Sequence, residues 1–142
     1  MMSLLNRLPM EEVLAAAYIV WADKSIANKV AQEATQIINQ TYKRKFAFYN
    51  GKSSRCIVGG LFYLLGFRYD GIKRQNELAD CLGTTDVSIR LSYRKWLETF
   101  PDLFWDVIGK FAEDKDLRYF VLIDLKEKIL NPGSKKVNNL LV

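Results

Sequence analysis

The sequence contains no histidine and only two cysteines, Cys56 and Cys81. Without histidine the chain cannot build a histidine-based triad, a histidine proton relay or most kinds of zinc site. Both cysteines stand in apolar surroundings at helical positions, so we expect buried free thiols, as in a reducing intracellular compartment. The sequence also offers no metal-ligand cluster, nucleophile–base pair or phosphate loop. We therefore expect neither an enzyme nor a cofactor.

Long apolar runs are missing as well. No uninterrupted apolar stretch reaches the length of a membrane span, and early acidic residues argue against a secretory signal. The 142 residues, of which 49% are apolar and 26% charged, suit one globular domain with its own core. These features predict a soluble intracellular protein that does not associate with membranes.

Positive charge exceeds negative charge along the chain, and the excess is local. The 21 basic and 16 acidic side chains give a net charge of +5, which favours an anionic partner. Residues 41–55 contain no acidic side chain and five basic ones: Lys43, Arg44, Lys45, Lys52 and Arg55. Two interpretations remain open, a phosphate-binding surface and a solvated helix end whose cations complement the helix dipole.

Apolar residues recur at three- and four-residue spacing, which predicts helix after helix. We expect a first helix to open at Pro9 and to bury a stripe that includes Tyr18. A second helix should run from about Ser25 to about Phe46 and bury one face.

The third predicted helix, residues 55–67, is apolar on nearly every side, which is typical of a central buried helix. Gly59 and Gly60 inside it cost roughly 1 kcal/mol each relative to alanine. We expect a neighbouring helix to approach this small-residue face closely.

Residues 73–104 predict a helical hairpin. Gly83 suits the left-handed position after a short helix. Thr84, Thr85 and Asp86 are candidates for the start of the next helix. This layout is typical of a helix-turn-helix, whose second helix can enter a DNA major groove.

The second helix of the hairpin has two faces. Its predicted core side holds Ile89, Tyr93, Trp96 and Leu97. The opposite side holds the four candidates for DNA base contacts: Val87, Arg90, Leu91 and Arg94. There the apolar side chains could contact thymine methyl groups while arginine reads guanine or holds phosphate. An ordinary amphipathic helix with a solvated charged face is an equal alternative.

Beyond Thr99-Phe100-Pro101, residues 105–131 predict one or two further helices with an apolar stripe over residues 117–129. We expect this segment to pack on the domain or to form a homodimer interface, because an exposed stripe would invite aggregation. Residues 132–142 read as a tail.

Three stretches of sequence point to one family. They are Gly51 to Ser54 followed by Ile57-Val58-Gly59-Gly60-Leu61-Phe62-Tyr63, then Gln75-Asn76-Glu77-Leu78-Ala79, then Asp86-Val87-Ser88-Ile89-Arg90 with Ser92-Tyr93-Arg94. Together they resemble the second cyclin repeat of the general transcription initiation factor IIB and of archaeal transcription factor B. The resemblance covers roughly residues 10–104, and its third stretch is the specific part.

The resemblance implies an all-α fold, with a single cyclin-like five-helix domain over residues 9–104 that ends in the helix-turn-helix pair. Promoter DNA is the implied partner, with TATA-binding protein or RNA polymerase as further ones. In that family, residues matching Val87 and Arg90 contact bases. The candidate phosphate contacts are Lys52, Ser53, Arg55, Arg74, Lys43 and Lys45. The implied location is the cytoplasm of an archaeal or viral system, or a eukaryotic nucleus.

The chain also departs from the family. Ser54 stands where proline is usual, and Arg74 replaces a capping threonine, so the start of the fourth helix should differ. The 142 residues contain no zinc ribbon and no first repeat. We therefore do not expect this chain alone to bridge polymerase, TATA-binding protein and DNA.

Two function classes follow. The first is a DNA-binding transcription factor or regulator that places residues 85–98 in the major groove. The second is a cyclin-fold protein-interaction module that binds polymerase, TATA-binding protein or another partner without binding DNA.

Overall fold

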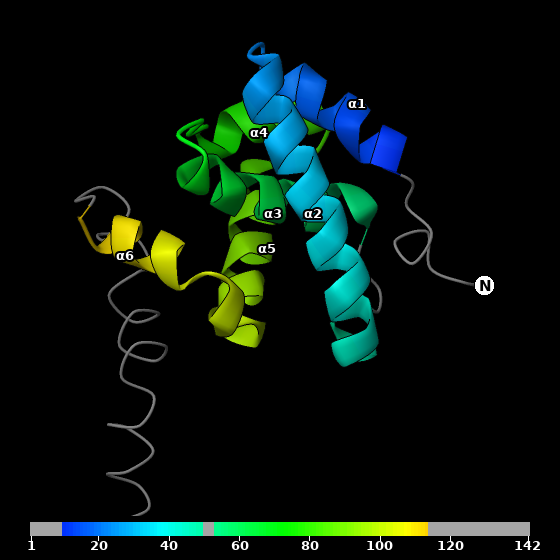
Figure 1. Cartoon of the computed structure of the whole chain (residues 1–142), viewed down its shortest axis with the longest axis vertical. Helices are drawn as coiled ribbons and strands as arrows, with labels where there is room; N and C mark the ends of the chain where they lie inside the picture. Colours follow the sequence, from blue (N-terminus) through cyan, green and yellow to red (C-terminus); the bar gives the residue numbers. More distant parts are fainter. Residues whose placement is uncertain (1–9, 50–52, 114–142) are drawn as a thin grey trace, which may run out of the picture. The chain divides into compact units, whose positions relative to one another are not determined.

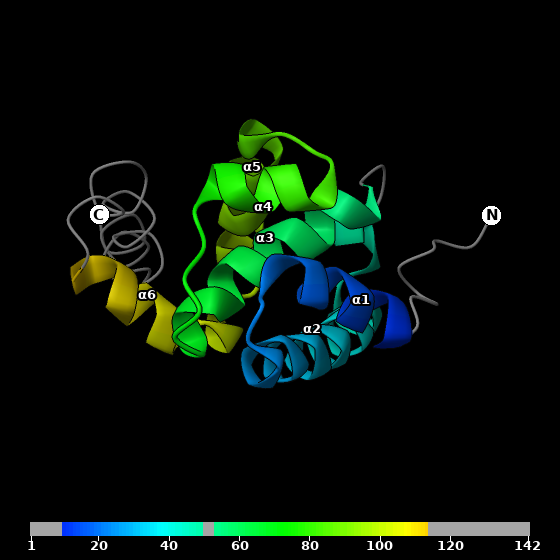
Figure 2. The same cartoon turned by 90° about the horizontal axis from the view of Figure 1, so that it is seen from above.

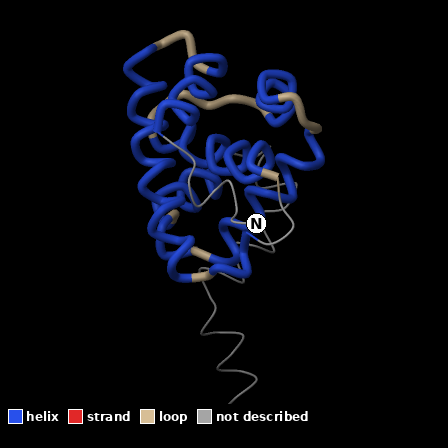
Figure 3. The backbone as a smooth tube through the Cα atoms, turned by 90° about the vertical axis from the view of Figure 1, so that its right-hand side faces the viewer, coloured by secondary structure: helices blue, strands red, loops and turns tan. Residues whose placement is uncertain are grey.

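The computed structural model describes residues 10–49 and 53–113, and all the regular structure within those ranges is helical (Figure 3). The all-α prediction is confirmed to that extent. The chain divides into two compact units, Met1–Tyr93 and Arg94–Val142. The first unit contains α1 (Met10–Val20), α2 (Lys24–Arg44), the 3-10 helix η2 (Phe46–Tyr49), α3 (Ser54–Arg68), α4 (Gln75–Leu82) and the first part of α5 (Asp86–Thr99) (Figure 1). The second contains the end of α5, η3 (Pro101–Leu103) and α6 (Trp105–Glu113).

Helices α1 and α2 lie side by side (Figures 1 and 2). Asp23 begins α2, because its carboxylate accepts hydrogen bonds from the backbone N–H groups of Ser25 and Ile26 at 2.9 and 3.3 Å. The predicted apolar face of α2 is confirmed for its buried members, which are Val30, Ala34, Ile37, Ile38 and Thr41.

The prediction that Tyr18 belongs to the core is wrong. Its side chain is 42% exposed, and its hydroxyl donates to Asn28 Oδ1 at 2.8 Å. A tyrosine can cover apolar surface with its ring while its hydroxyl stays at a polar edge, so periodicity alone misplaces it. Val20 and Trp21 are the buried residues at this end of α1.

Helix α3 is the centre of the first unit. Every residue from Ile57 to Phe67 is buried, as the continuous apolar sequence predicts. Helix α4 lies next to it (Figure 2). At the far end of α3 the chain returns to α1, where the Trp21 indole N–H donates to the backbone oxygen of Gly71 at 2.6 Å.

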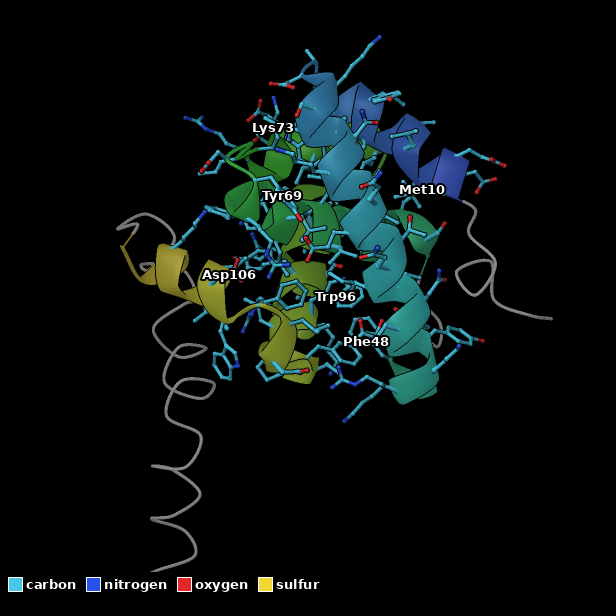
Figure 4. All side chains as sticks on the ribbon, viewed as in Figure 1. Met10, Phe48, Tyr69, Lys73, Trp96 and Asp106 are labelled. Atoms are coloured by element: carbon cyan, nitrogen blue, oxygen red, sulfur yellow. The ribbon has the colours of Figure 1, made fainter. Side chains whose placement is uncertain are left out.

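A polar link joins α2 to the end of α3. The Glu33 carboxylate accepts hydrogen bonds from both Arg68 and Tyr69, and Tyr69 is labelled in Figure 4. A second polar contact, between Thr41 and Tyr49, lies in the core. There, burial raises the pKa of Tyr49 to about 12, an effect that the hydrogen bond with Thr41 partly offsets.

The second unit has an aromatic cluster of its own. The rings of Phe100 and Phe104 lie 5.6 and 6.2 Å from that of Trp96, centroid to centroid, and all three side chains are buried. Helix α6 confirms the first of the helices expected after Pro101. The predicted stripe over residues 117–129, the tail 132–142 and the start at Pro9 lie outside the described residues.

Candidate nucleic-acid interface

The predicted hairpin is formed by α4, a short turn and α5. Gly83 has a φ of +71°, the left-handed conformation expected for it. The next backbone N–H, that of Thr84, donates to the oxygen of Ala79 at 3.0 Å and closes the end of α4. Of the three candidates for the cap of α5, Thr85 fills the role, since its hydroxyl oxygen accepts from the Ser88 N–H at 3.1 Å.

The start of α4 differs from a capped helix, as Arg74 led us to expect. A guanidinium has no acceptor atom, so the Arg74 side chain cannot cap the helix. Instead, the Glu77 carboxylate accepts from the backbone N–H of Arg74 at 3.0 Å. Half of the reciprocal arrangement of a capping box is therefore present.

Helix α5 is seated on the small residues of α3. Ile89 and Tyr93 are fully buried, and the Tyr93 ring lies 4.5 Å from that of Tyr63. A Cβ added to Gly59 would lie 2.3 Å from Ile89 Cδ1, and one added to Gly60 would lie 2.7 Å from the backbone nitrogen of Tyr93. The close approach predicted at these glycines is thus confirmed.

The opposite face of α5 points outward. Val87 is 46% exposed and Leu91 is 58% exposed, with the half-buried Arg90 between them. Two apolar side chains and one guanidinium thus share this face. The apolar side chains of this face can contact thymine methyl groups, while Arg90 can donate to the acceptor atoms of guanine.

Arg94, the fourth candidate for a base contact, is the first residue of the second unit and is half-buried. Trp96 and Leu97, predicted to lie on the core side, are fully buried.

The candidate phosphate contacts fall into two groups. Ser53 and Arg55 are exposed at the start of α3, and Arg74 is exposed just before α4, so these three border the hairpin. Lys43 and Lys45 are exposed at the end of α2, which Figure 1 shows well away from α4. Lys52 lies outside the described residues.

The start of α3 contacts the turn of the hairpin. Arg55 Nη1 donates to the backbone oxygen of Gly83 at 3.3 Å, and Cys56 Sγ lies 3.7 Å from Thr84 Oγ1. Sequence reasoning did not identify these contacts, which join residues 28 positions apart. Only the placement of α3 beside the turn creates them.

Cys56 and Cys81 are both half-buried free thiols, so the expectation of full burial is wrong. Cys56 is the third residue of α3, where the Ser53 hydroxyl accepts from its N–H at 3.3 Å. Partial burial raises the pKa of the Cys56 thiol, but hydrogen bonds with Ser53, Thr84 and Ser88 outweigh this and lower the pKa below its ordinary value.

A shallow groove of about 170 Å³ adjoins Arg55. Val13, Ala16, Val58 and Leu82 form its apolar part, with Glu12, Ser54 and Arg55 as its polar lining. The sequence carries no signal for it, because its walls come from three helices whose packing periodicity does not specify.

Among residues 10–49 and 53–113, no group of three or more acidic or cysteine side chains could hold a metal ion. Within the same ranges, none of the helices has the length and apolar character needed to cross a membrane. Comparisons of the chain with protein-family models, with curated proteins and with solved structures found no match.

Proposed function

We propose that the chain is a DNA-binding transcription factor or regulator that places α5 in the major groove of promoter DNA. The observation that carries this proposal is the division of α5 into two faces. Ile89 anchors one face in the core, whereas Val87 and Leu91 on the other face are about half exposed on either side of Arg90. The preceding turn has the Gly83 conformation and the Thr85 cap that a helix-turn-helix needs.

Each exposed residue has a role in this proposal. Arg90 donates to guanine O6 and N7, while Val87 and Leu91 contact thymine methyl groups. Arg94 adds a further base contact. Ser53, Arg55 and Arg74 hold phosphates beside the hairpin, and Lys52, Lys43 and Lys45 extend the phosphate contacts.

The arrangement of helices in this proposal is that of a single cyclin-like repeat of the transcription factor B type. A buried third helix with a glycine pair, followed by the hairpin, supports it. TATA-binding protein and RNA polymerase are the protein partners that this resemblance implies.

The test is a titration of duplex DNA over a range of salt concentrations. A duplex selected from a random pool with the wild-type protein is compared with unselected duplex. We expect Arg90→Ala to lose about 1–3 kcal/mol of preference for the selected duplex, since a base contact is removed. Lys29→Ala, at an exposed cation of α2, serves as the control and should keep the preference.

The absence of wild-type binding at low salt would refute groove reading by this protein. The exposure of Val87 and Leu91 would then favour the second candidate function, a protein-interaction module.

A further inference from the structure

Two consecutive residues at the start of α3 reach the turn between α4 and α5. Arg55 Nη1 donates to the backbone oxygen of Gly83 at 3.3 Å, and Cys56 Sγ and Thr84 Oγ1 lie 3.7 Å apart. The same guanidinium nitrogen would lie 3.5 Å from a Cβ added to Gly83, so it rests directly against the turn. We call these two contacts the α3 brace.

The first turn of α5 is held by polar contacts, which also include a hydrogen bond between Cys56 and Ser88. Thr85, Asp86 and Val87 are all exposed, and the first fully buried residue of the helix is Ile89. Apolar packing therefore fixes α5 from Ile89 onward but leaves its beginning to polar contacts. The α3 brace acts at that unpacked end.

We propose that Arg55 and Thr84 are positioning residues, which hold the first turn of α5 on α3 and so fix where Val87 meets a base. This inference rests on the proposed function. A guanidinium has five N–H donors, so Arg55 can donate to Gly83 and still present other N–H groups to a phosphate. Because Thr84 carries no charge, its substitution tests the positioning role without removing a phosphate contact.

The first arm of the test needs no DNA. Hydrogen exchange is measured at the amides of Thr84 and Ser88, which are bonded to Ala79 O and Thr85 Oγ1. We expect exchange to be about two- to tenfold faster in Thr84→Val and in Arg55→Ala, as for the loss of one hydrogen bond. In the double variant, the fold-increase in exchange rate should be smaller than the product of the two single fold-increases, because both changes release the same turn.

Matched controls make the same chemical changes elsewhere. Thr35→Val removes a hydroxyl that donates to the oxygen of Ala31 within α2, and Lys29→Ala removes an exposed cation. Neither should alter exchange at Thr84 or Ser88. Unchanged exchange in Thr84→Val and Arg55→Ala would overturn the brace, whatever the protein does with DNA.

The second arm measures the ratio of affinities for selected and unselected duplex at several salt concentrations. Thr84→Val should lower that ratio about two- to tenfold while leaving the salt dependence unchanged, because no charge is lost. Faster exchange with an unchanged ratio would overturn the positioning role and leave a purely structural contact. If the wild-type protein fails to bind DNA, the proposed function and the role in recognition fail together, while the exchange data still decide whether the brace exists.

Discussion

Cys56 is a thiol whose pKa lies below its ordinary value. It lies at the start of α3 beside Ser53, Thr84 and Ser88, and these hydroxyl groups lower its pKa despite partial burial. A thiol titrates at about 8.5 in an unfolded chain. Deprotonation of Cys56 therefore stabilises the fold above that pH, and this contribution is lost as the pH falls through the lower, folded value.

We predict that Cys56 reacts with iodoacetamide at lower pH in the folded protein than in the urea-unfolded chain, because the thiolate is the reactive form. The measurement is the alkylation rate against pH by peptide mass spectrometry, in a Cys81→Ser background. Ser53→Ala should move the folded profile toward higher pH by removing one of the hydrogen bonds. Coincident profiles for folded and unfolded chains would contradict the prediction.

At the scale of single residues, sequence patterns served best where one interaction dominates. Gly83 was predictable because only a residue without a Cβ tolerates the left-handed turn well, and Ile89 because an apolar residue on a periodic face has no polar alternative. Tyr18 and the two cysteines were predicted to be buried, and each is partly exposed. These side chains combine an apolar body with a polar atom, so their burial depends on partners distant in the sequence.

At the scale of the elements, α3 and α5 can approach closely because α3 has glycine, which lacks a side chain, at the contact. A Cβ added to Gly60 would lie 2.1 Å from Ser92 Oγ and 2.7 Å from the backbone nitrogen of Tyr93. Because one of these atoms belongs to the backbone, a rotamer change cannot relieve the overlap. Helix α5 would have to move away from α3 at this point.

We predict that Gly60→Ala destabilises the protein by about 1–3 kcal/mol through overpacking, even though alanine is the better helix former by about 1 kcal/mol. The measurement is the free energy of unfolding in urea. Gly109→Ala is the control, since a Cβ added there meets no described atom within 4 Å apart from its chain neighbours and the backbone of its own helix. That change should stabilise by up to about 1 kcal/mol. An equal or greater stability of Gly60→Ala would refute the steric account.

The elements themselves were largely predictable, and their contacts were not. Apolar periodicity predicts both α2 and α5, and Thr85 is among the predicted caps of α5. The Asp23 cap of α2 was not predicted, and α2 ends at Arg44 rather than near Phe46. The α3 brace and the groove beside Arg55 require knowledge of which helices are neighbours. Periodicity specifies which face of a helix is buried but not which helix covers it. For the same reason, the cyclin-like arrangement remains a proposal.

At the scale of the whole molecule, the net charge of +5 raises the question of whether charge or its placement governs DNA binding. Helix α2 offers a matched comparison, because it carries exposed cations at both ends. Lys24 and Lys29 lie near its start, and Lys43 and Lys45 near its end. At 1.5 Å per residue the two ends are about 30 Å apart.

We predict that the pair of changes Lys43→Ala and Lys45→Ala flattens the slope of log K against log salt by about 1.8, that is about 0.9 for each lost phosphate contact. The pair Lys24→Ala and Lys29→Ala also lowers the net charge from +5 to +3 (5 − 2 = 3) but should leave the slope unchanged. Salt titrations of both double variants provide the measurement. Equal flattening by both pairs would show that net charge and not its placement governs the slope, and an unchanged slope in the Lys43→Ala, Lys45→Ala variant would show that the end of α2 does not contact DNA.

The two neighbouring glycines of α3, Gly59 and Gly60, differ in the substitutions that each position can tolerate. At Gly59 the obstacle is Ile89 Cδ1, the far end of a side chain. The paired changes Gly59→Ala and Ile89→Val would add one carbon atom to α3 and remove one from α5. The packed volume between the two helices would therefore be conserved. Gly60 faces backbone and has no such exchange. Over many generations residues 59 and 89 can therefore change together, whereas residue 60 stays glycine for as long as α5 packs this closely on α3.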